Sequence, residues 1–185
     1  MRVIAGQYKG RRLFSINDHR IRPATDRVKE SIFNILASRL DFVDSTVLDL
    51  FAGTGSLGIE ALSRGARRAV FVESSGDAVR TIERNLEALN AQSSSTVIHS
   101  DAMRYMKKST EQFTIVFADP PYAYRETGRL PDLVFERRLV GSSGFLVIEH
   151  QSQVRFPDRA GFTVGLARKF GSTVVSFFQA IANSH

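Results

Sequence analysis

The chain alternates short apolar segments with longer amphipathic ones, and this alternation limits its fold more than any other feature. The apolar segments have the length and the β-branched and aromatic content of buried strands, whereas the others repeat apolar residues at helical spacing. Strands that alternate with helices predict parallel βαβ units in a doubly wound sheet. The predicted strands are 46–51, 69–73, 96–99, 113–118 and 145–149, and the predicted helices between them are 56–63, 77–90 and 102–108.

The last part of the chain breaks this rhythm. Residues 162–170 and 173–180 are two strand-like runs joined by Gly171-Ser172, which suits a tight two-residue hairpin turn. Ordinary dinucleotide-binding sheets usually end in parallel units, whereas the S-adenosylmethionine methyltransferase variant ends in an antiparallel hairpin, although hairpins end many other sheets too. We therefore expect an α/β, Rossmann-like fold with a seven-stranded, mostly parallel sheet and a C-terminal antiparallel hairpin.

The first 40 residues differ from the rest in charge. They hold nine Lys and Arg residues against three acids, whereas the remaining 145 residues hold 16 of each sign, so the net charge of +6 falls entirely in this part. A turn-rich segment leads into a helix expected from Asp26. We expect residues 1–40 to form a basic N-terminal arm and helix packed on a catalytic domain of residues 41–185. Such an arm suits a phosphate backbone, and a solvated face that only confers solubility is an equal alternative.

Composition excludes several classes of site. The chain has no cysteine, which excludes disulfides, thiolate metal sites and a cysteine nucleophile. No segment approaches the ~20 apolar residues of a membrane span, and the first residues lack the apolar stretch of a secretory signal. The four histidines show no metal-ligand spacing. We expect a monomeric, soluble cytoplasmic protein with no metal and no membrane partner.

A glycine-rich turn follows the first predicted strand. Gly53 and Gly55 allow a ligand to approach the backbone closely, and Gly58 permits tight packing of the following helix on the sheet. This spacing occurs in sites for NAD and for S-adenosylmethionine, and it does not separate them. Asp49, inside the strand, resembles the acid with which methyltransferases shape the loop around the methionine moiety. A buried structural aspartate that caps the turn is the alternative.

Two further acids follow the next predicted strands. Glu73 lies about 20 residues after the glycine turn, where a carboxylate can accept hydrogen bonds from both ribose hydroxyls of a nucleoside. Asp101, with Ala102 after it, lies where methyltransferases commonly bind the adenine amino group. An N-cap of the helix 102–108 is an equally good interpretation of Asp101. Both acids support a nucleoside ligand without identifying it.

The tetrapeptide Asp119-Pro120-Pro121-Tyr122 follows the fourth predicted strand and is the strongest functional signal. Ligands of open α/β sheets bind outside the carboxyl ends of the strands, so this motif should face the same crevice as the glycine turn. The Asp119 carboxylate and a proline-turn carbonyl can accept hydrogen bonds from an exocyclic base amine and aim its nitrogen at a sulfonium methyl group. The prolines fix the backbone that holds these acceptors, and Tyr122 offers a ring on which an extruded base can stack. A rigid turn with a purely structural role is the weaker alternative.

Residues 2–13, 22–34, 49–66 and 119–122 together carry a more specific pattern. They resemble the bacterial 16S ribosomal RNA guanine-N2 methyltransferases of the RsmD type, and the resemblance covers nearly the whole chain. It implies the class I S-adenosylmethionine methyltransferase fold and methylation of guanine N2 in small-subunit RNA, within an assembling 30S subunit. It also implies that Asp49, Glu73, Asp101 and Asp119 take the roles given above.

The basic arm then acquires a use. We hypothesise that Arg11, Arg12, Arg22 and Arg27 contact phosphates around the target loop, because a compact catalytic domain has little other surface for holding RNA. An ion pair between Arg27 and Glu30 on the helix surface is a nearly equal alternative. Three other functions stay open: methylation of an adenine N6 amine in DNA or RNA, noncatalytic RNA binding during assembly, and NAD-dependent oxidoreduction.

Overall fold

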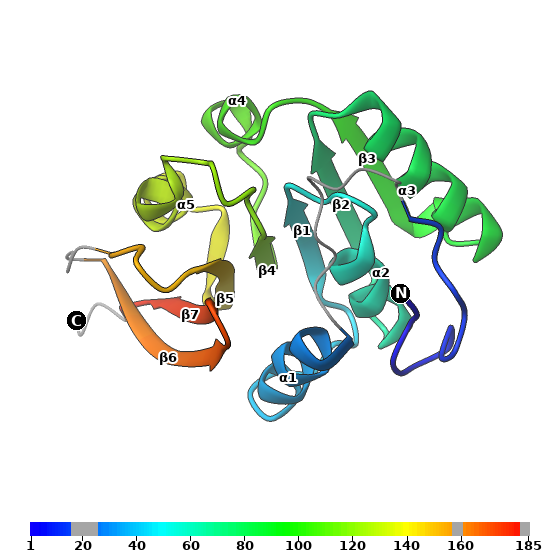
Figure 1. Ribbon diagram of the computed structural model, residues 1–185, viewed down its shortest axis with the longest axis horizontal. Helices are drawn as coiled ribbons and strands as arrows, with labels where there is room; N and C mark the ends of the chain where they lie inside the picture. Colours follow the sequence, from blue (N-terminus) through cyan, green and yellow to red (C-terminus); the bar gives the residue numbers. More distant parts are fainter. Residues whose placement is uncertain (16–25, 157–160, 182–185) are drawn as a thin grey trace.

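A computed structural model describes residues 1–15, 26–156 and 161–181. Its centre is one sheet of seven strands: β1 (Thr46–Leu50), β2 (Arg68–Glu73), β3 (Ser95–His99), β4 (Phe113–Ala118), β5 (Val140–Gln151), β6 (Phe162–Phe170) and β7 (Thr173–Ala180). The strand order is β3-β2-β1-β4-β5-β7-β6, as Figure 1 shows. The first five strands are parallel, and β7 and β6 form the antiparallel hairpin. The predicted mixed sheet is confirmed, and it is β7 that pairs with β5.

Helices cover both faces of the sheet (Figure 1). The helices are α1 (Asp26–Ala37), α2 (Ser56–Ser63), α3 (Gly76–Ala88), α4 (Ala102–Lys108) and α5 (Leu130–Glu136). Buried residues of the first three helices share one apolar cluster with one face of the sheet, and buried residues of α4 and α5 share a second cluster with the other face. This three-layer arrangement is the one that alternating strands and helices predict.

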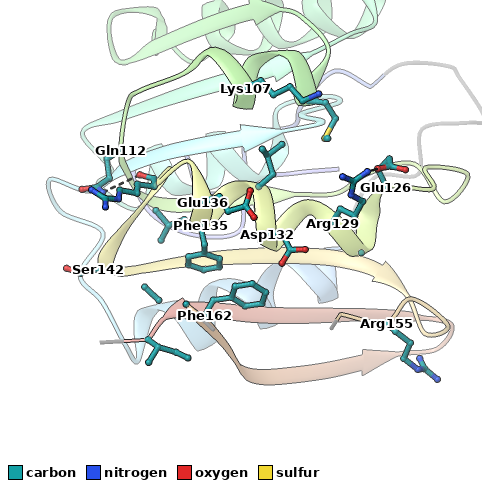
Figure 2. Close-up of a pocket in the computed structure, with 18 residues that line it drawn as sticks. Lys107, Gln112, Glu126, Arg129, Asp132, Phe135, Glu136, Ser142, Arg155 and Phe162 are labelled. Atoms are coloured by element: carbon teal, nitrogen blue, oxygen red, sulfur yellow. Dashed lines mark hydrogen bonds and ion pairs between the residues drawn. The ribbon is translucent and has the colours of Figure 1, made fainter. Parts of the chain in front are cut away.

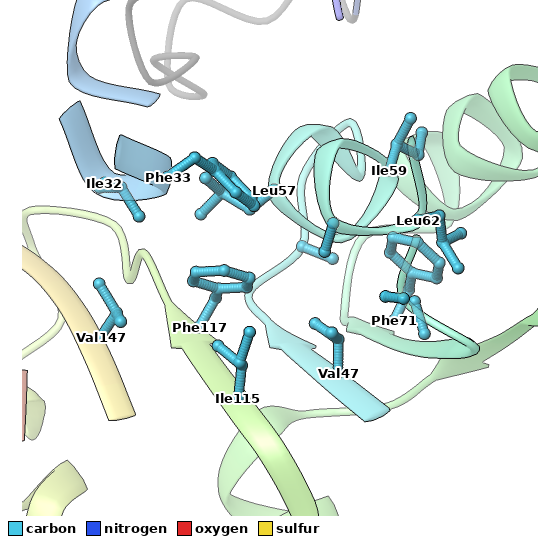
Figure 3. Close-up of a cluster of buried hydrophobic side chains, with 14 of the residues drawn as sticks. Ile32, Phe33, Val47, Leu57, Ile59, Leu62, Phe71, Ile115, Phe117 and Val147 are labelled. Atoms are coloured by element: carbon cyan, nitrogen blue, oxygen red, sulfur yellow. The ribbon is translucent and has the colours of Figure 1, made fainter. Parts of the chain in front are cut away.

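The apolar cluster beneath α1 and α2 packs these two helices on strands β4 and β2 (Figure 3). The Phe33 ring of α1 is fully buried, 5.6 Å from the Phe117 ring of β4 and 5.5 Å from the Phe42 ring. Burial of one such side chain stabilises the fold by about 1.5–3 kcal/mol. Phe71 of β2 packs under α2 so closely that a Cβ on Gly58 would lie 2.4 Å from its ring. The predicted role of Gly58 in helix packing is therefore confirmed.

The first residues of the chain are docked on α2 through a buried charge cluster. The Glu60 carboxylate accepts hydrogen bonds from the backbone N–H groups of Ile4 (2.8 Å) and Ala5 (3.0 Å). Its Oε2 atom also lies 3.6 Å from the fully buried Lys29 Nζ of α1. Gly6 then turns with a φ of +81°, and a Cβ there would lie 1.7 Å from the Ser63 carbonyl oxygen. Residues 1–8 are thus held tightly against α2.

The structure contains one helix that the sequence did not predict. Residues 130–136 form α5, which begins with Leu130-Pro131 and spans only seven residues. Two helical turns give too few repeats for a periodic pattern, and proline at the start of a helix also reads as a turn. In addition, β5 begins at Val140 and not at Phe145 as predicted. The sequence did not indicate this earlier start because residues 141–144 are two glycines and two serines, which have low strand propensity.

Candidate active site

The predicted acidic residues meet at one edge of the sheet. Asp49 is the fourth residue of β1, Glu73 is the last residue of β2, and Asp101 follows β3 by two residues. Asp119 follows the last residue of β4 directly. Because these strands are parallel, all four positions lie at or beside the carboxyl edge, where ligands of such sheets bind.

The glycine turn is held by Glu73. Gly53 and Gly55 adopt φ values of +57° and +77°, which suit glycine and strain most other residues. The Gly53 N–H donates to Glu73 Oε2 (2.9 Å), and the Ser74 and Ser75 N–H groups donate to Oε1 (2.8 Å each). The carboxylate therefore organises two loops.

Asp49 supports the same turn from inside the sheet. Its side chain is buried, and its Oδ2 accepts a hydrogen bond from the Gly58 N–H (2.9 Å), which joins β1 to the start of α2. Burial raises the pKa of Asp49 to about 8, the Gly58 hydrogen bond opposes this rise, and the negative charge of Glu73 adds to it. This contact confirms the interpretation of Asp49 as a buried aspartate that caps the turn, and a role toward the methionine moiety stays a prediction.

Asp101 caps α4. Its Oδ1 accepts a hydrogen bond from the Arg104 N–H at 2.9 Å, and the backbone is extended, as at a helix N-cap. The side chain is exposed, whereas the neighbouring Ala102 is buried as the first residue of the helix. The N-cap interpretation is confirmed, and it leaves the second carboxylate oxygen of Asp101 outside the cap.

The proline motif forms a tight turn beside β4. The Tyr124 N–H donates to the Pro121 carbonyl at 2.8 Å. Of the two proline carbonyls, that of Pro120 is therefore the one that this hydrogen bond does not use. Pro120 is buried and Asp119 is half-buried. Tyr122 is 41% exposed, and its hydroxyl forms a 2.5 Å hydrogen bond with Thr173 Oγ1 at the start of β7. The Tyr122 ring is thus oriented by the C-terminal hairpin.

Asp119 is surrounded by negative charge. Burial raises its pKa well above the ordinary value of a carboxyl group, and the charges of Glu149 and Asp49 raise it further. Glu149 follows Ile148, which pairs with Ala118, so it stands beside Asp119 near the end of β5. Sequence reasoning missed both Glu149 and Thr173. Glu149 ends a predicted strand, as Glu73 does, and this position is the only signal that could have indicated it.

The structure does not gather the predicted basic residues at this edge. The Arg11 guanidinium donates to the Ala88 carbonyl (2.6 Å) at the end of α3, which lies opposite the edge where α3 begins beside Glu73. The backbone of Arg12 pairs with that of Arg2 in an isolated antiparallel β-bridge. Arg27 is exposed in the first turn of α1, and no ion pair joins it to Glu30 within the described residues. Arg22 lies outside the described residues.

A groove of about 1170 Å³ opens on the face of the sheet that α4 and α5 cover (Figure 2). It lies between α4, α5 and strands β5 and β6, and its lining includes Met103, Asp132, Phe135 and Phe162. None of the four predicted acids lines it. In the described ranges, no three His, Cys, Asp or Glu side chains are arranged to hold a metal ion. No helix in those ranges is long and apolar enough to cross a bilayer.

Known proteins resemble this chain over most of its length. The family model described as "Conserved hypothetical protein 95" matches residues 1–179. YlbH of Bacillus subtilis, a candidate rRNA methyltransferase, is 39% identical over 184 residues, which cover 97% of this chain and 98% of YlbH. Ribosomal RNA small subunit methyltransferase D of Haemophilus influenzae is 35% identical over 152 residues, covering 80% of this chain and 78% of the relative.

Solved structures share the fold. Escherichia coli yhhF is 31% identical, with a TM-score of 0.86 and 99% of both chains covered. An RNA methyltransferase of Salinibacter ruber in complex with S-adenosyl-L-homocysteine is 17% identical, with a TM-score of 0.65, and covers 89% of this chain and 96% of its own. The class I methyltransferase fold expected for this chain is confirmed. The chain therefore belongs to the family of "Conserved hypothetical protein 95", which is that of the RsmD-type methyltransferases.

Proposed function

We propose that this protein is an S-adenosylmethionine-dependent methyltransferase that modifies the exocyclic N2 amine of a guanine in small-subunit ribosomal RNA. The observation that carries the proposal is the arrangement at the carboxyl edge. Asp119 and the Pro120 carbonyl lie after β4, next to β1 with its glycine turn and one strand further from Glu73. An amine acceptor and a nucleoside-binding turn therefore share one edge of the sheet.

The residues at β1, β2 and β3 fit the cofactor. Close backbone approach at Gly53 and Gly55 suits the methionine moiety, and Glu73 Oε2 can accept from a ribose hydroxyl while it holds the Gly53 N–H. The Asp101 oxygen outside the helix cap, beside Ala102, suits the adenine amino group. When bound, S-adenosylmethionine supplies the methyl group as a sulfonium cation.

The substrate class follows from the motif and from the relatives. A guanine N2 amine is a weak nucleophile because its lone pair is delocalised into the ring. Two acceptors, the Asp119 carboxylate and the Pro120 carbonyl, can bind both of its hydrogens and fix the direction of its lone pair. The relative from Haemophilus influenzae is named for small-subunit ribosomal RNA, and the match covers most of this chain. These points favour RNA over NAD chemistry and over a noncatalytic role.

Asp119 also has a task after transfer. The methylated nitrogen carries one proton too many, and a carboxylate with a raised pKa is a better acceptor for it than an ordinary one. The Tyr122 ring, held through Thr173, supports the extruded base by stacking. The protein therefore acts by orientation and electrostatics, and no covalent bond to the enzyme is required.

The proposal is tested by transfer of a labelled methyl group from S-adenosylmethionine to small-subunit particles and to naked small-subunit RNA. Digestion to nucleosides should place the label in N2-methylguanosine for at least one of the two substrates. Label in N6-methyladenosine would redirect the proposal to adenine. No transfer to either substrate, with S-adenosylhomocysteine bound normally, would contradict an RNA methyltransferase.

A further inference from the structure

A row of paired residues connects Asp119 to the outer strand of the sheet. Glu149 of β5 pairs with Val175 of β7, which pairs with Arg168 of β6. Directly opposed residues of antiparallel strands share a face, so Arg168 lies on the same face as Glu149. Three strand spacings of about 4.8 Å place Arg168 about 14 Å from Asp119. The end of β6 thus belongs to the same edge as the proposed base site.

The hairpin turn is attached to the proline motif. Thr173, directly after the turn Gly171-Ser172, accepts or donates the 2.5 Å hydrogen bond to the Tyr122 hydroxyl. The Ser152 N–H, just beyond the end of β5, donates to the Ser172 carbonyl at 3.2 Å. These two contacts hold the turn and the 152–156 loop in a fixed position relative to the motif.

Three cations lie around the end of the edge strand β6. Arg168 and Lys169 are exposed near the hairpin turn, and as successive strand residues they point to opposite faces of the sheet, Arg168 to the face of Glu149. Arg155 is exposed on the loop after β5 (Figure 2). Among the described residues, its guanidinium donates to the backbone carbonyls of Ser152 and Val154. Within the described part of the chain, no carboxylate forms an ion pair with any of the three, whereas Arg129 is paired with Glu126 at 2.8 Å. Their charge is therefore available to a phosphate.

We propose that Arg155, Arg168 and Lys169 form an RNA-binding surface, the hairpin surface, which binds phosphates of nucleotides that flank the target base. This inference rests on the proposed function, because it assumes an RNA strand entering the Asp119 site. It places phosphate binding at the C-terminal hairpin, whereas Arg11, one of the basic residues predicted for that role, caps α3 at the opposite edge. Contacts to flanking nucleotides determine which base reaches such a pocket.

The test compares two double variants that each remove two positive charges. R168A/K169A removes them from the hairpin surface, and K107A/K108A removes them from the end of α4, which lies at the opposite edge of the sheet. RNA affinity is measured at several salt concentrations for the full chain with its natural substrate RNA. R168A/K169A should bind RNA about 10-fold more weakly, with a log–log salt slope reduced by about 1 to 2. K107A/K108A should match the native protein in salt slope.

Three further readings separate phosphate binding from other roles. The KM for S-adenosylmethionine and the kcat at saturating RNA should stay within about two-fold of native values for R168A/K169A. The charge-conserving R168K/K169R variant should restore the native salt slope, and R155A should lower it by about 1.

Lysine on an edge strand also prevents strand pairing between molecules. If R168A/K169A aggregates but keeps the native salt slope as a monomer, the inference is overturned.

Failure of the proposed function is recognised separately. Native protein that transfers no methyl group to small-subunit RNA would contradict the function itself, before any variant is compared. Native protein that methylates RNA, with equal salt slopes for native, R168A/K169A and K107A/K108A, would overturn the hairpin surface alone.

Discussion

Asp119, directly after β4, and Glu149, near the end of β5, stand side by side, because each follows one member of the paired residues Ala118 and Ile148. The charge of Glu149 raises the pKa of Asp119 beyond the rise that burial produces. Two carboxyl groups that interact in this way titrate as a pair, so the apparent pKa values belong to both. Glu149 therefore adds to the effect of burial and shifts the ionisation of Asp119 to higher pH.

The pH dependence of methyl transfer should reveal this pair. If Asp119 orients the amine, its ionised form is the stronger acceptor and the base, so kcat/KM for RNA should rise with pH through an apparent pKa well above that of an ordinary carboxyl group. Glu149→Gln removes the neighbouring charge and should move the acid limb of the profile to lower pH. The measurement is the rate of methyl transfer between pH 5 and 9 at subsaturating RNA.

A matched control is Glu126→Gln, which removes a charge beyond the proline motif that does not act on Asp119. Its acid limb should coincide with that of the native protein. An unmoved acid limb in Glu149→Gln would show that the charge of Glu149 does not govern the titration of Asp119.

Asp49 should make the fold less stable as pH rises. Its pKa is about 8 in the folded chain against an ordinary value of 3.8, so between these values the folded state binds the proton that the unfolded state releases. Stability then falls with rising pH across this window. Asp49→Asn keeps an oxygen for the Gly58 N–H but does not titrate. Between pH 5 and pH 7, its free energy of unfolding, measured with urea, should rise by about 2 kcal/mol relative to that of the native protein.

Asp77→Asn, at an exposed position on α3, serves as the comparison and should give no such trend. Parallel stability curves for native protein and Asp49→Asn across this window would mean that Asp49 is ionised in the folded chain, contrary to the effect of its burial.

Lys29 should be essential for stability although it lies outside the active site. Its ammonium group is fully buried, 3.6 Å from Glu60 Oε2, and also donates to the Arg2 carbonyl at 2.7 Å. Removal of one partner from a buried ion pair leaves the other charge poorly compensated. Lys29→Met should therefore lower the free energy of unfolding by about 3 kcal/mol. Lys9→Met, on the exposed part of the same arm, should change it by less than about 0.5 kcal/mol.

The two tyrosines after Pro121 should respond oppositely to loss of their hydroxyls. The Tyr124 hydroxyl is buried and has no hydrogen-bond partner within the described residues, and burial together with the charges of Asp101 and Glu126 raises its pKa to about 12. Tyr124→Phe should be neutral or stabilising by about 1 kcal/mol, because it removes an unsatisfied polar group. Tyr122→Phe loses the hydrogen bond to Thr173 and should cost about 1 kcal/mol. The measurement is the thermal unfolding of both variants beside the native protein. A clear loss of stability in Tyr124→Phe would indicate a partner for its hydroxyl.

The sequence predicted the parts of the site that depend on the order of strands. Asp49, Glu73, Asp101 and Asp119 each stand at or after a predicted strand, and parallel pairing alone brings such positions to one edge. Gly58 was predictable for a similar reason, since helix packing on a strand requires a small residue at that point.

Contacts between distant segments could not be predicted in this way. Thr173 reaches Tyr122 only because β7 is inserted between β5 and β6, and a hairpin pattern does not say which of its strands joins the sheet. The position of Arg11 depends on where the N-terminal arm docks, and this is set by the buried contacts of Glu60 with Ile4 and Ala5. Charge counts along the sequence carry no information about that docking.

The most direct test of the central claim is the single-turnover rate of methyl transfer to small-subunit RNA by Asp119→Ala, with cofactor binding measured in parallel. If Asp119 orients the amine, the rate should fall by about 100-fold or more, while the Kd for S-adenosylhomocysteine stays within about three-fold of the native value. A rate within about three-fold of native, with the RNA and cofactor bound normally, would contradict the assignment of Asp119 as the acceptor for the base amine.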